Sequence, residues 1–260
     1  MESGITDEEA GTSDQYTKDM GMNIAIICAG GNGERMHTKE SKVFLRLNGK
    51  PVIYYTLKTL AEYKPIDAIM VTARTVDINR LRRLIDQDRI GKVISIEEAL
   101  DTRQGSTYKA LTHLKEMNIP SDSYVIIHNA VNPFVRHVEL DRCLDAARKY
   151  GASLLGFEAT DTVKVVNDNH FIDHTPNRNR VWIAQTPQII RFDIALEAFE
   201  IASKRGFIAT DDTTLVEVIH ERVKFVECSR ENFKITYPQD MELARRIHAK
   251  RVREKSTWYA

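Results

Sequence analysis

The residues with the clearest chemical potential are a glycine-rich segment and the two cations that follow it. The segment comes directly after the apolar run Ile24–Cys28, and glycines there let backbone N–H groups approach an anion because no Cβ blocks the way. Fixed cations beside such a concavity suit phosphate groups. The pattern predicts a site for a nucleoside triphosphate, with a simple tight turn as the alternative. Its members are Ala29, Gly30, Gly31, Asn32 and Gly33, then Arg35 and Lys42.

Two other classes of glycine loop do not fit this segment. A dinucleotide-binding fingerprint needs a third glycine where this chain has Met36. A Walker loop needs Gly-Lys-Ser/Thr at the start of a helix, and the sequence contains none. An NAD-dependent oxidoreductase is therefore disfavoured.

Composition narrows the class of protein. The 260 residues carry 37 Lys and Arg against 37 Asp and Glu, so no overall field attracts nucleic acid or an anionic membrane. Only Cys28, Cys143 and Cys228 occur, without the spacing of a zinc site or a disulfide framework. No apolar stretch approaches the roughly 18 residues of a membrane span. We expect a cytoplasmic protein that binds neither nucleic acid nor membrane.

Short apolar strands and amphipathic helices alternate along the chain. Residues 68–73, 93–96 and 124–128 are typical of buried strands, and residues 52–62, 78–86 and 106–117 have helical spacing, as do 193–204, 211–218 and 240–253. Such alternation predicts an α/β fold with a doubly wound, mostly parallel sheet. We expect a flexible tail at residues 1–22, one domain at 23–255 and a short tail at 256–260.

A hairpin interrupts this alternation. Residues 162–166 and 170–174 flank the turn sequence Asn167-Asp168-Asn169, which predicts a β-arm at about residues 160–184. Such an arm exposes strand edges unless something covers them. A second copy of the chain is the economical cover, so we expect a homodimer.

Ligands of open α/β sheets bind beyond the carboxyl ends of the strands. The Gly30 loop, the loop at residues 101–106 and the loop at residues 128–134 all follow predicted strands, so we expect them at one rim. His128 ends a buried strand and is interpreted as a core histidine rather than a catalyst.

Further motifs follow in an order that resembles a known family. From about Ile24 to Arg246 the chain is similar to cytidylyltransferases of the methylerythritol-phosphate type and to their relatives that act on ribitol 5-phosphate. Taken singly, Arg178 and Lys234 are no more than surface cations; the shared order of the motifs favours a functional role. The motifs are Ala29–Met36, Ser41–Leu45, Asp101 with Arg103 and Ser106, Asp161–Thr162, Arg178, Gln185–Gln188, Thr210–Asp211 and Asn232–Thr236.

The resemblance implies a Rossmann-like nucleotidyltransferase that moves CMP from CTP to a polyol phosphate and releases pyrophosphate. It implies Mg²⁺ bridging the triphosphate and catalysis by cations, with no general base, because the acceptor phosphate is already an anion. By the resemblance, the residues fall into three groups. Arg35 and Lys42 are catalytic; Ala29, Gly30, Gly31, Asn32, Gly33, Asp101, Arg103, Ser106, Asn129 and Ala130 bind nucleotide; Asn132, Thr162, Arg178, Thr186, Thr210 and Lys234 bind the acceptor.

The chain departs from the family pattern in two loops. Ala99 and Leu100 replace a pair of glycines, and Asn129 and Asn132 stand where the family has an aspartate and an arginine. An amide keeps hydrogen-bonding capacity without charge. Two alternatives therefore stay open beside an ordinary enzyme: a member with an altered acceptor, and a degenerate member that binds nucleotide as a partner subunit.

Overall fold

The computed structural model describes residues 21–31, 36 and 40–257. Residues 1–20 of the tail expected at residues 1–22 lie outside this part of the chain, as do the site residues Asn32, Gly33 and Arg35. Within it, a seven-stranded sheet has the order β11-β7-β10-β6-β1-β4-β5. The strands are β1 (Asn23–Ala29), β4 (Ala68–Ala73), β5 (Val93–Glu98), β6 (Tyr124–Asn129), β7 (Ala152–Glu158), β10 (Trp182–Arg191) and β11 (Val223–Glu227).

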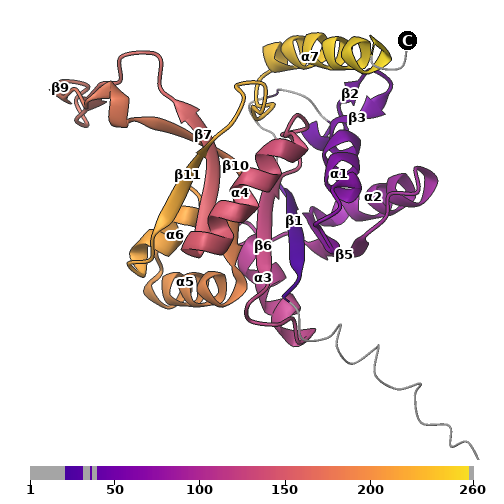
Figure 1. Ribbon diagram of the computed structural model, residues 1–260, viewed down its shortest axis with the longest axis horizontal. Coiled ribbons are helices and arrows are strands. Elements are labelled where there is room, and N and C mark those ends of the chain that lie inside the picture. Colours follow the sequence, from indigo (N-terminus) through magenta and orange to yellow (C-terminus); the bar gives the residue numbers. More distant parts are fainter. Residues whose placement is uncertain (1–20, 32–35, 37–39, 258–260) are drawn as a thin grey trace, which may run out of the picture.

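The sheet is parallel except at β10, which runs antiparallel to both β6 and β7. Helices cover both faces (Figure 1). The helices are α1 (Val52–Glu62), α2 (Thr75–Gln87), α3 (Arg103–Glu116), α4 (His137–Tyr150), α5 (Phe192–Arg205), α6 (Asp212–Val218) and α7 (Pro238–Thr257). The predicted doubly wound, mostly parallel α/β sheet is confirmed.

Alternation along β1 explains the two layers of helices. Successive side chains of a strand point to opposite faces. Ala25 and Ile27 join a buried cluster with α1, α2, α4 and α7, whereas Ile24 and Ile26 join a second cluster with α3, α5 and α6. Both faces of β1 are therefore buried, which is why it reads as one continuous apolar run.

Three strands of the sheet were not predicted from the sequence. The first half of β10 mixes apolar and polar residues of uneven burial, and β11 is an edge strand in which exposed and half-buried residues mix. Neither pattern has the clear period of two that marks a strand. Strand β7 is continuously buried from Ala152 to Leu155, and it lies directly after α4 with only Gly151 between them.

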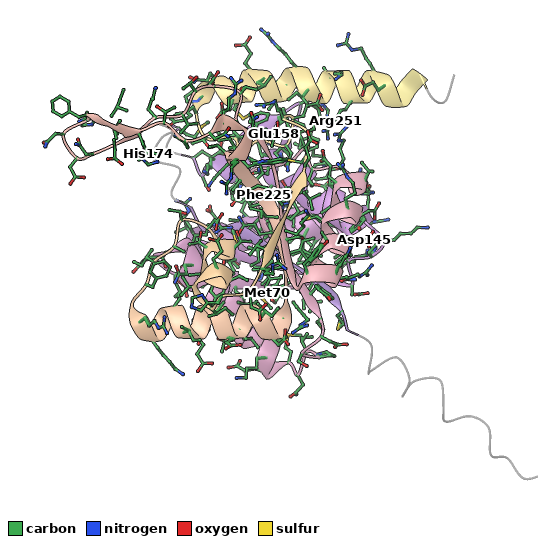
Figure 2. The ribbon with its side chains drawn as sticks, turned by 60° about the vertical axis from the view of Figure 1, so that its left-hand side comes forward. Met70, Asp145, Glu158, His174, Phe225 and Arg251 are labelled. Carbon is green, nitrogen blue, oxygen red and sulfur yellow. The ribbon has the colours of Figure 1, made fainter. Side chains whose placement is uncertain are left out.

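The hairpin forms an arm on β8 (Val165–Val166) and β9 (Ile172–His174), two short antiparallel strands. Asn167 makes the turn: its Oδ1 accepts hydrogen bonds from the backbone N–H groups of Asn169 and Phe171, both at 3.1 Å. Figure 1 shows the arm leaving the body beside β7, and Figure 2 shows His174 far out on it while Met70 lies within the body.

The strand order reverses between β1 and β6. The chain passes from β1 outward to β4 and β5, then returns to place β6 on the other side of β1. Such a reversal leaves a crevice beyond the carboxyl ends of the two strands. The Gly30 loop and Asn129 stand on its two sides, which locates the candidate site.

Candidate nucleotide site

One cavity of about 810 Å³ opens at the carboxyl ends of β1, β4, β5 and β6. This volume lies within the roughly 300–1,000 Å³ of small-molecule pockets. Three loops that are distant in sequence meet there, as expected from the strand order. The predicted site residues that line the cavity are Ala29, Gly30, Gly31, Lys42, Asp101, Arg103, Ser106, Asn129 and Lys234.

Gly30 lets two loops of the cavity approach each other. A Cβ at this position would lie 2.4 Å from the Cβ of Ala99, closer than any two such atoms approach. At Gly31 the same construction meets nothing within 4 Å. Glycine is therefore required at residue 30 for packing, whereas at residue 31 it leaves the backbone open toward the cavity.

Lys42 is held in place by its buried neighbours. It begins the 3₁₀ turn η2 (Lys42–Phe44), in which Val43 and Phe44 are buried in the core. The backbone N–H of Phe44 donates to the Ser41 carbonyl at 2.9 Å, and the Arg80 guanidinium carbon lies 4.0 Å from the Phe44 ring centroid. The turn is thus anchored while the lysine lines the cavity.

The loop ahead of α3 is closed by its own hydroxyl groups. Ser106 Oγ accepts from the Leu100 backbone N–H at 2.9 Å and donates to the Thr102 carbonyl at 2.8 Å. Thr102 caps the helix by accepting from the Gly105 N–H at 2.9 Å. The Ser106 hydroxyl therefore fixes the conformation of this loop through hydrogen bonds to its backbone. Asp101 is exposed at the cavity rim.

Arg103 reaches across to a buried carboxylate that sequence reasoning missed. Its Nη2 donates to Oδ2 of Asp212 at 2.6 Å, and Asp212 is only 1% exposed. Burial acts to lower the pKa of Arg103, but the Asp212 carboxylate outweighs it and holds that pKa above its usual value. Arg103, which is half-buried, therefore stays charged in an ion pair with a buried carboxylate.

The end of β6 carries a chain of three amides. Asn129 Nδ2 donates to Asn132 Oδ1 at 3.2 Å, and Asn132 Nδ2 donates to Gln185 Oε1 at 3.4 Å. Asn132 is fully buried and does not line the cavity, whereas Asn129 does. Ala130 is also buried, and its carbonyl accepts from the Thr56 hydroxyl at 2.9 Å.

His128 lies beneath this loop as a buried, neutral histidine. Its Nε2 is 3.0 Å from the Asn132 carbonyl, and burial lowers its pKa to about 4. Its Nδ1 has no hydrogen-bond partner among the described residues. The interpretation of His128 as a core residue agrees with this burial.

Lys234 reaches the cavity from a loop that is tied to both β6 and β10. The backbone N–H of Ile235 donates to the Val131 carbonyl at 2.9 Å, and Asn232 Nδ2 donates to the Thr186 carbonyl at 2.8 Å. Thr186 is buried, and its hydroxyl accepts from the Asn129 N–H at 3.2 Å. These bonds place Lys234 in the same cavity as Lys42, although the two residues are far apart in sequence.

Five of the six predicted acceptor-binding residues do not line this cavity within one chain. Asn132 and Thr186 are buried beside it. Thr162 and Thr210 are exposed. Arg178 lines a separate cavity of about 550 Å³ at the base of the arm, where its Nη1 donates to the Thr160 carbonyl at 3.2 Å. A single copy of the chain therefore does not bring the predicted residues together completely.

The cavity also contains residues that the sequence motifs did not single out. Thr72 lies near the end of β4, Arg74 and Thr75 follow that strand, and Glu98 ends β5. Arg74 Nε donates to Asp77 Oδ2 at 2.8 Å, which fixes its position. The rule that ligands lie at the carboxyl ends of parallel strands was the available signal for these residues.

The described part of the chain contains neither a cluster of metal-binding side chains nor a helix suited to a membrane. No group of three or more His, Cys, Asp or Glu side chains suited to a metal ion occurs among residues 21–31, 36 and 40–257. No helix in the same ranges is both long and apolar enough to cross a membrane.

Burial raises the pKa of the Cys28 thiol at the cavity wall, so this thiol is not poised as a nucleophile.

Sequence comparison relates the chain to one family. The family model described as IspD, 2-C-methyl-D-erythritol 4-phosphate cytidylyltransferase, matches residues 23–250. A 2-C-methyl-D-erythritol 4-phosphate cytidylyltransferase of Desulforamulus reducens is 36% identical over 227 residues, 86% of this chain and 95% of that protein. The protein of the same name from Geobacillus thermodenitrificans is 36% identical over 230 residues, 88% and 98% of the two chains.

Solved structures give the same relationship. The 4-diphosphocytidyl-2C-methyl-D-erythritol synthase of Anaerococcus prevotii matches with a TM-score of 0.77 and 29% identity, covering 88% of this chain and 96% of that one. The Francisella tularensis 2-C-methyl-D-erythritol 4-phosphate cytidylyltransferase matches with a TM-score of 0.73 and 28% identity, covering 86% and 98%. With the cavity between β1 and β6, these matches establish that the chain belongs to the 2-C-methyl-D-erythritol 4-phosphate cytidylyltransferase family.

Proposed function

We propose that this protein transfers CMP from CTP to 2-C-methyl-D-erythritol 4-phosphate or to a closely similar polyol phosphate, releasing pyrophosphate. The observation that carries the proposal is the convergence of Lys42, Lys234 and the open backbone of Gly31 on one cavity. These groups come from three separate segments and share an affinity for phosphate. Family membership supports the same reaction.

The chemistry needs positioned cations more than a base. The acceptor phosphate is an anion near neutral pH and attacks the α-phosphorus of CTP in line, forming a P–O bond while the bond to pyrophosphate breaks. Lys42 and Lys234, which line the same cavity, stabilise the charge that develops in the transition state. The neutral, buried state of His128 agrees with a reaction that uses no histidine base.

Mg²⁺ is the metal that fits this proposal. It is usually held by substrate phosphates and only one or two protein ligands, so a cluster of three acidic residues is not required. The side-chain carbonyl of Asn129, at the cavity wall, is a suitable protein ligand. When bound, the ion neutralises triphosphate charge and orients the α-phosphate.

The proposal includes a homodimer in which each arm serves the neighbouring site. The exposed apolar side chains Phe171 (71% exposed) and Ile172 (62%) support burial of the arm against another surface. Arg178 and Thr162 lie at or near the arm base, away from the cavity of their own chain. A partner copy would supply these residues.

A pyrophosphate-release assay tests the function. The purified protein is given CTP and Mg²⁺ with 2-C-methyl-D-erythritol 4-phosphate, ribitol 5-phosphate or other polyol phosphates. We expect release with at least one acceptor, and Lys42→Ala to lower the rate about 10²- to 10³-fold, as removal of one preorganised group does elsewhere. The control is Lys115→Ala, an exposed lysine near the opposite end of α3 from the cavity, which should retain the parent rate.

The amide pair Asn129–Asn132 supports a second candidate, a nucleotide-binding partner subunit. It replaces two charges that family members use at this point with neutral groups. In that case CTP would raise the melting temperature of the protein, yet no acceptor would release pyrophosphate. That combination of results would replace the enzyme proposal with the binding one.

A further inference from the structure

The first turn of α3 holds the loop that leads into α6. Gln104 Nε2 donates to the Phe207 carbonyl at 2.9 Å, and Gln104 Oε1 accepts from the Ala209 N–H at 2.9 Å. The neighbouring Arg103 binds Asp212 through the ion pair, across 109 residues of sequence. Three hydrogen bonds from Arg103 and Gln104 therefore hold residues 207–212 against the first turn of α3.

A strand residue fastens the other side of the same loop. Gln188 of β10 is 1% exposed, and its Oε1 accepts from the backbone N–H groups of Asp212 at 2.9 Å and Thr213 at 3.1 Å. Its Nε2 donates to Asp211 Oδ2 at 3.1 Å. Thr210 therefore lies between residues 207–209, which Gln104 holds, and residues 211–213, which Gln188 holds. Thr210 itself is exposed.

This hydrogen-bond network joins a loop predicted to bind the nucleotide to a loop predicted to bind the acceptor. Arg103 and Ser106 line the cavity as predicted nucleotide-binding residues. Thr210, a predicted acceptor contact, is exposed and does not line it within one chain. Gln104 does not line the cavity; its side chain is hydrogen-bonded to the backbone of the second loop. A shift of the α3 amino terminus on nucleotide binding would therefore move the Thr210 loop with it.

We propose that Gln104 and Asp212 are positioning residues that clasp the Thr210 loop to the nucleotide loop, so that CTP binding sets the geometry of the acceptor site. This inference rests on the proposed function for the identity of the two substrates. Coupling between two binding sites is reciprocal, so the acceptor strengthens CTP binding by the same factor.

The decisive variant is Gln104→Ala, because Gln104 is uncharged and partly exposed, and its loss leaves no buried charge behind. We expect the acceptor KM to rise about 3- to 30-fold, the usual range for residues that carry coupling, while kcat changes little. A merely structural role would lower the active fraction, reducing kcat and leaving KM unchanged. The matched control is Gln87→Ala, an exposed glutamine at the end of α2, which should leave both constants unchanged.

Hydrogen–deuterium exchange provides a readout that does not depend on turnover. In the ligand-free protein, Gln104→Ala should speed amide exchange in residues 207–214, whereas Gln87→Ala should not. In the parent protein, CTP should slow exchange in the same residues, and Gln104→Ala should remove that protection. In the ligand-free protein, the double variant Arg103→Gln/Asp212→Asn, which removes the ion pair without leaving one charge alone, should also speed exchange in residues 207–214. Its protection by CTP is not compared, because Arg103 is itself a predicted nucleotide-binding residue.

The outcomes separate the two proposals. If the parent releases no pyrophosphate with any acceptor, the proposed function fails, and the clasp is still judged by exchange in residues 207–214. Unchanged exchange in both variants, or a lower kcat with an unchanged acceptor KM, would overturn the clasp. Faster exchange together with the loss of CTP protection would support it even in a protein that only binds nucleotide.

Discussion

Asn129 and Asn132 are hydrogen-bonded to each other, so the two departures from the family pattern form one coupled exchange. An aspartate and an arginine at these positions would make an ion pair in the same place, with Asn132 fully buried. Replacing both members avoids the orphaned charge that either single replacement would leave. The pair is therefore a candidate for altered acceptor choice with an intact fold.

A double-mutant cycle tests this coupling. We expect Asn132→Arg alone to lower the free energy of unfolding by about 3–5 kcal/mol, because it buries a charge without a carboxylate partner. Adding Asn129→Asp should restore most of that loss. Urea unfolding of the parent, both single variants and the double variant measures the coupling energy. Additivity within about 0.5 kcal/mol would show that the two residues act independently.

His128 makes stability depend on pH. Its folded pKa of about 4 lies below its usual value of 6.5, so the unfolded chain binds a proton first as pH falls. The free energy of unfolding should therefore decline between about pH 6.5 and pH 4, by about 3 kcal/mol from this group. Above pH 6.5 the contribution is fully present.

The measurement is the free energy of unfolding by urea at several pH values, compared between the parent and His128→Gln. Glutamine keeps a donor for the Asn132 carbonyl but does not titrate. The difference between the two proteins isolates His128 from the carboxylates that also protonate in this range. Equal slopes in both proteins would contradict the assignment.

At the scale of elements, the Gly30 loop contacts the residue after β5 through a side chain, whereas the family pattern has a glycine there. Ala99 stands where a glycine is usual, and its Cβ occupies the space beside Gly30. Two loops that contact through Ala99 and Gly30 can tolerate only one side chain between them.

We therefore expect Gly30→Ala to destabilise the protein by about 1–3 kcal/mol, as overpacking does, and to weaken CTP binding by displacing the loop. The compensating variant Gly30→Ala/Ala99→Gly should recover stability and binding, because the total volume is conserved. Urea unfolding and the CTP-induced rise in melting temperature measure the two effects. A double variant no better than Gly30→Ala would mean that backbone freedom at residue 30, rather than space, decides the matter.

At the scale of the whole molecule, the proposed homodimer predicts that the arm is needed for both dimerisation and turnover. Phe171→Asp/Ile172→Asp places charges on the exposed apolar end of the arm and should give a monomer with little turnover, while CTP still binds. Light scattering and pyrophosphate release measure the two properties. Leu243→Asp, on an exposed apolar residue of α7, is the matched control and should stay dimeric.

Complementation tests whether the partner supplies Arg178. Lys42→Ala and Arg178→Ala should each be nearly inactive alone. When they are mixed and allowed to exchange subunits, half of the dimers pair one variant with the other, and each such dimer has one intact site. Activity should then return to about a quarter of the parent value. No recovery would place Arg178 in the site of its own chain, provided that exchange is verified.

The sequence alone determined the sheet class, most helices and the loops that surround the cavity. These features depend on local periodicity: continuous apolar runs for β1, β4 and β6, and helical spacing for α1, which begins and ends as predicted. The crevice followed from the rule for parallel strands, so Gly30, Asp101 and Asn129 were expected at one rim before any contact was known.

Only the tertiary structure decided which side chains meet. Asp212 partners Arg103 across 109 residues, and Asn132 turns inward to an amide chain instead of facing the cavity. The antiparallel insertion of β10 between β6 and β7 could not be predicted either, because its first half mixes exposed, half-buried and buried residues without a regular period. Such pairings depend on how packed elements bring distant residues together, and periodicity within one segment carries no information about its partner.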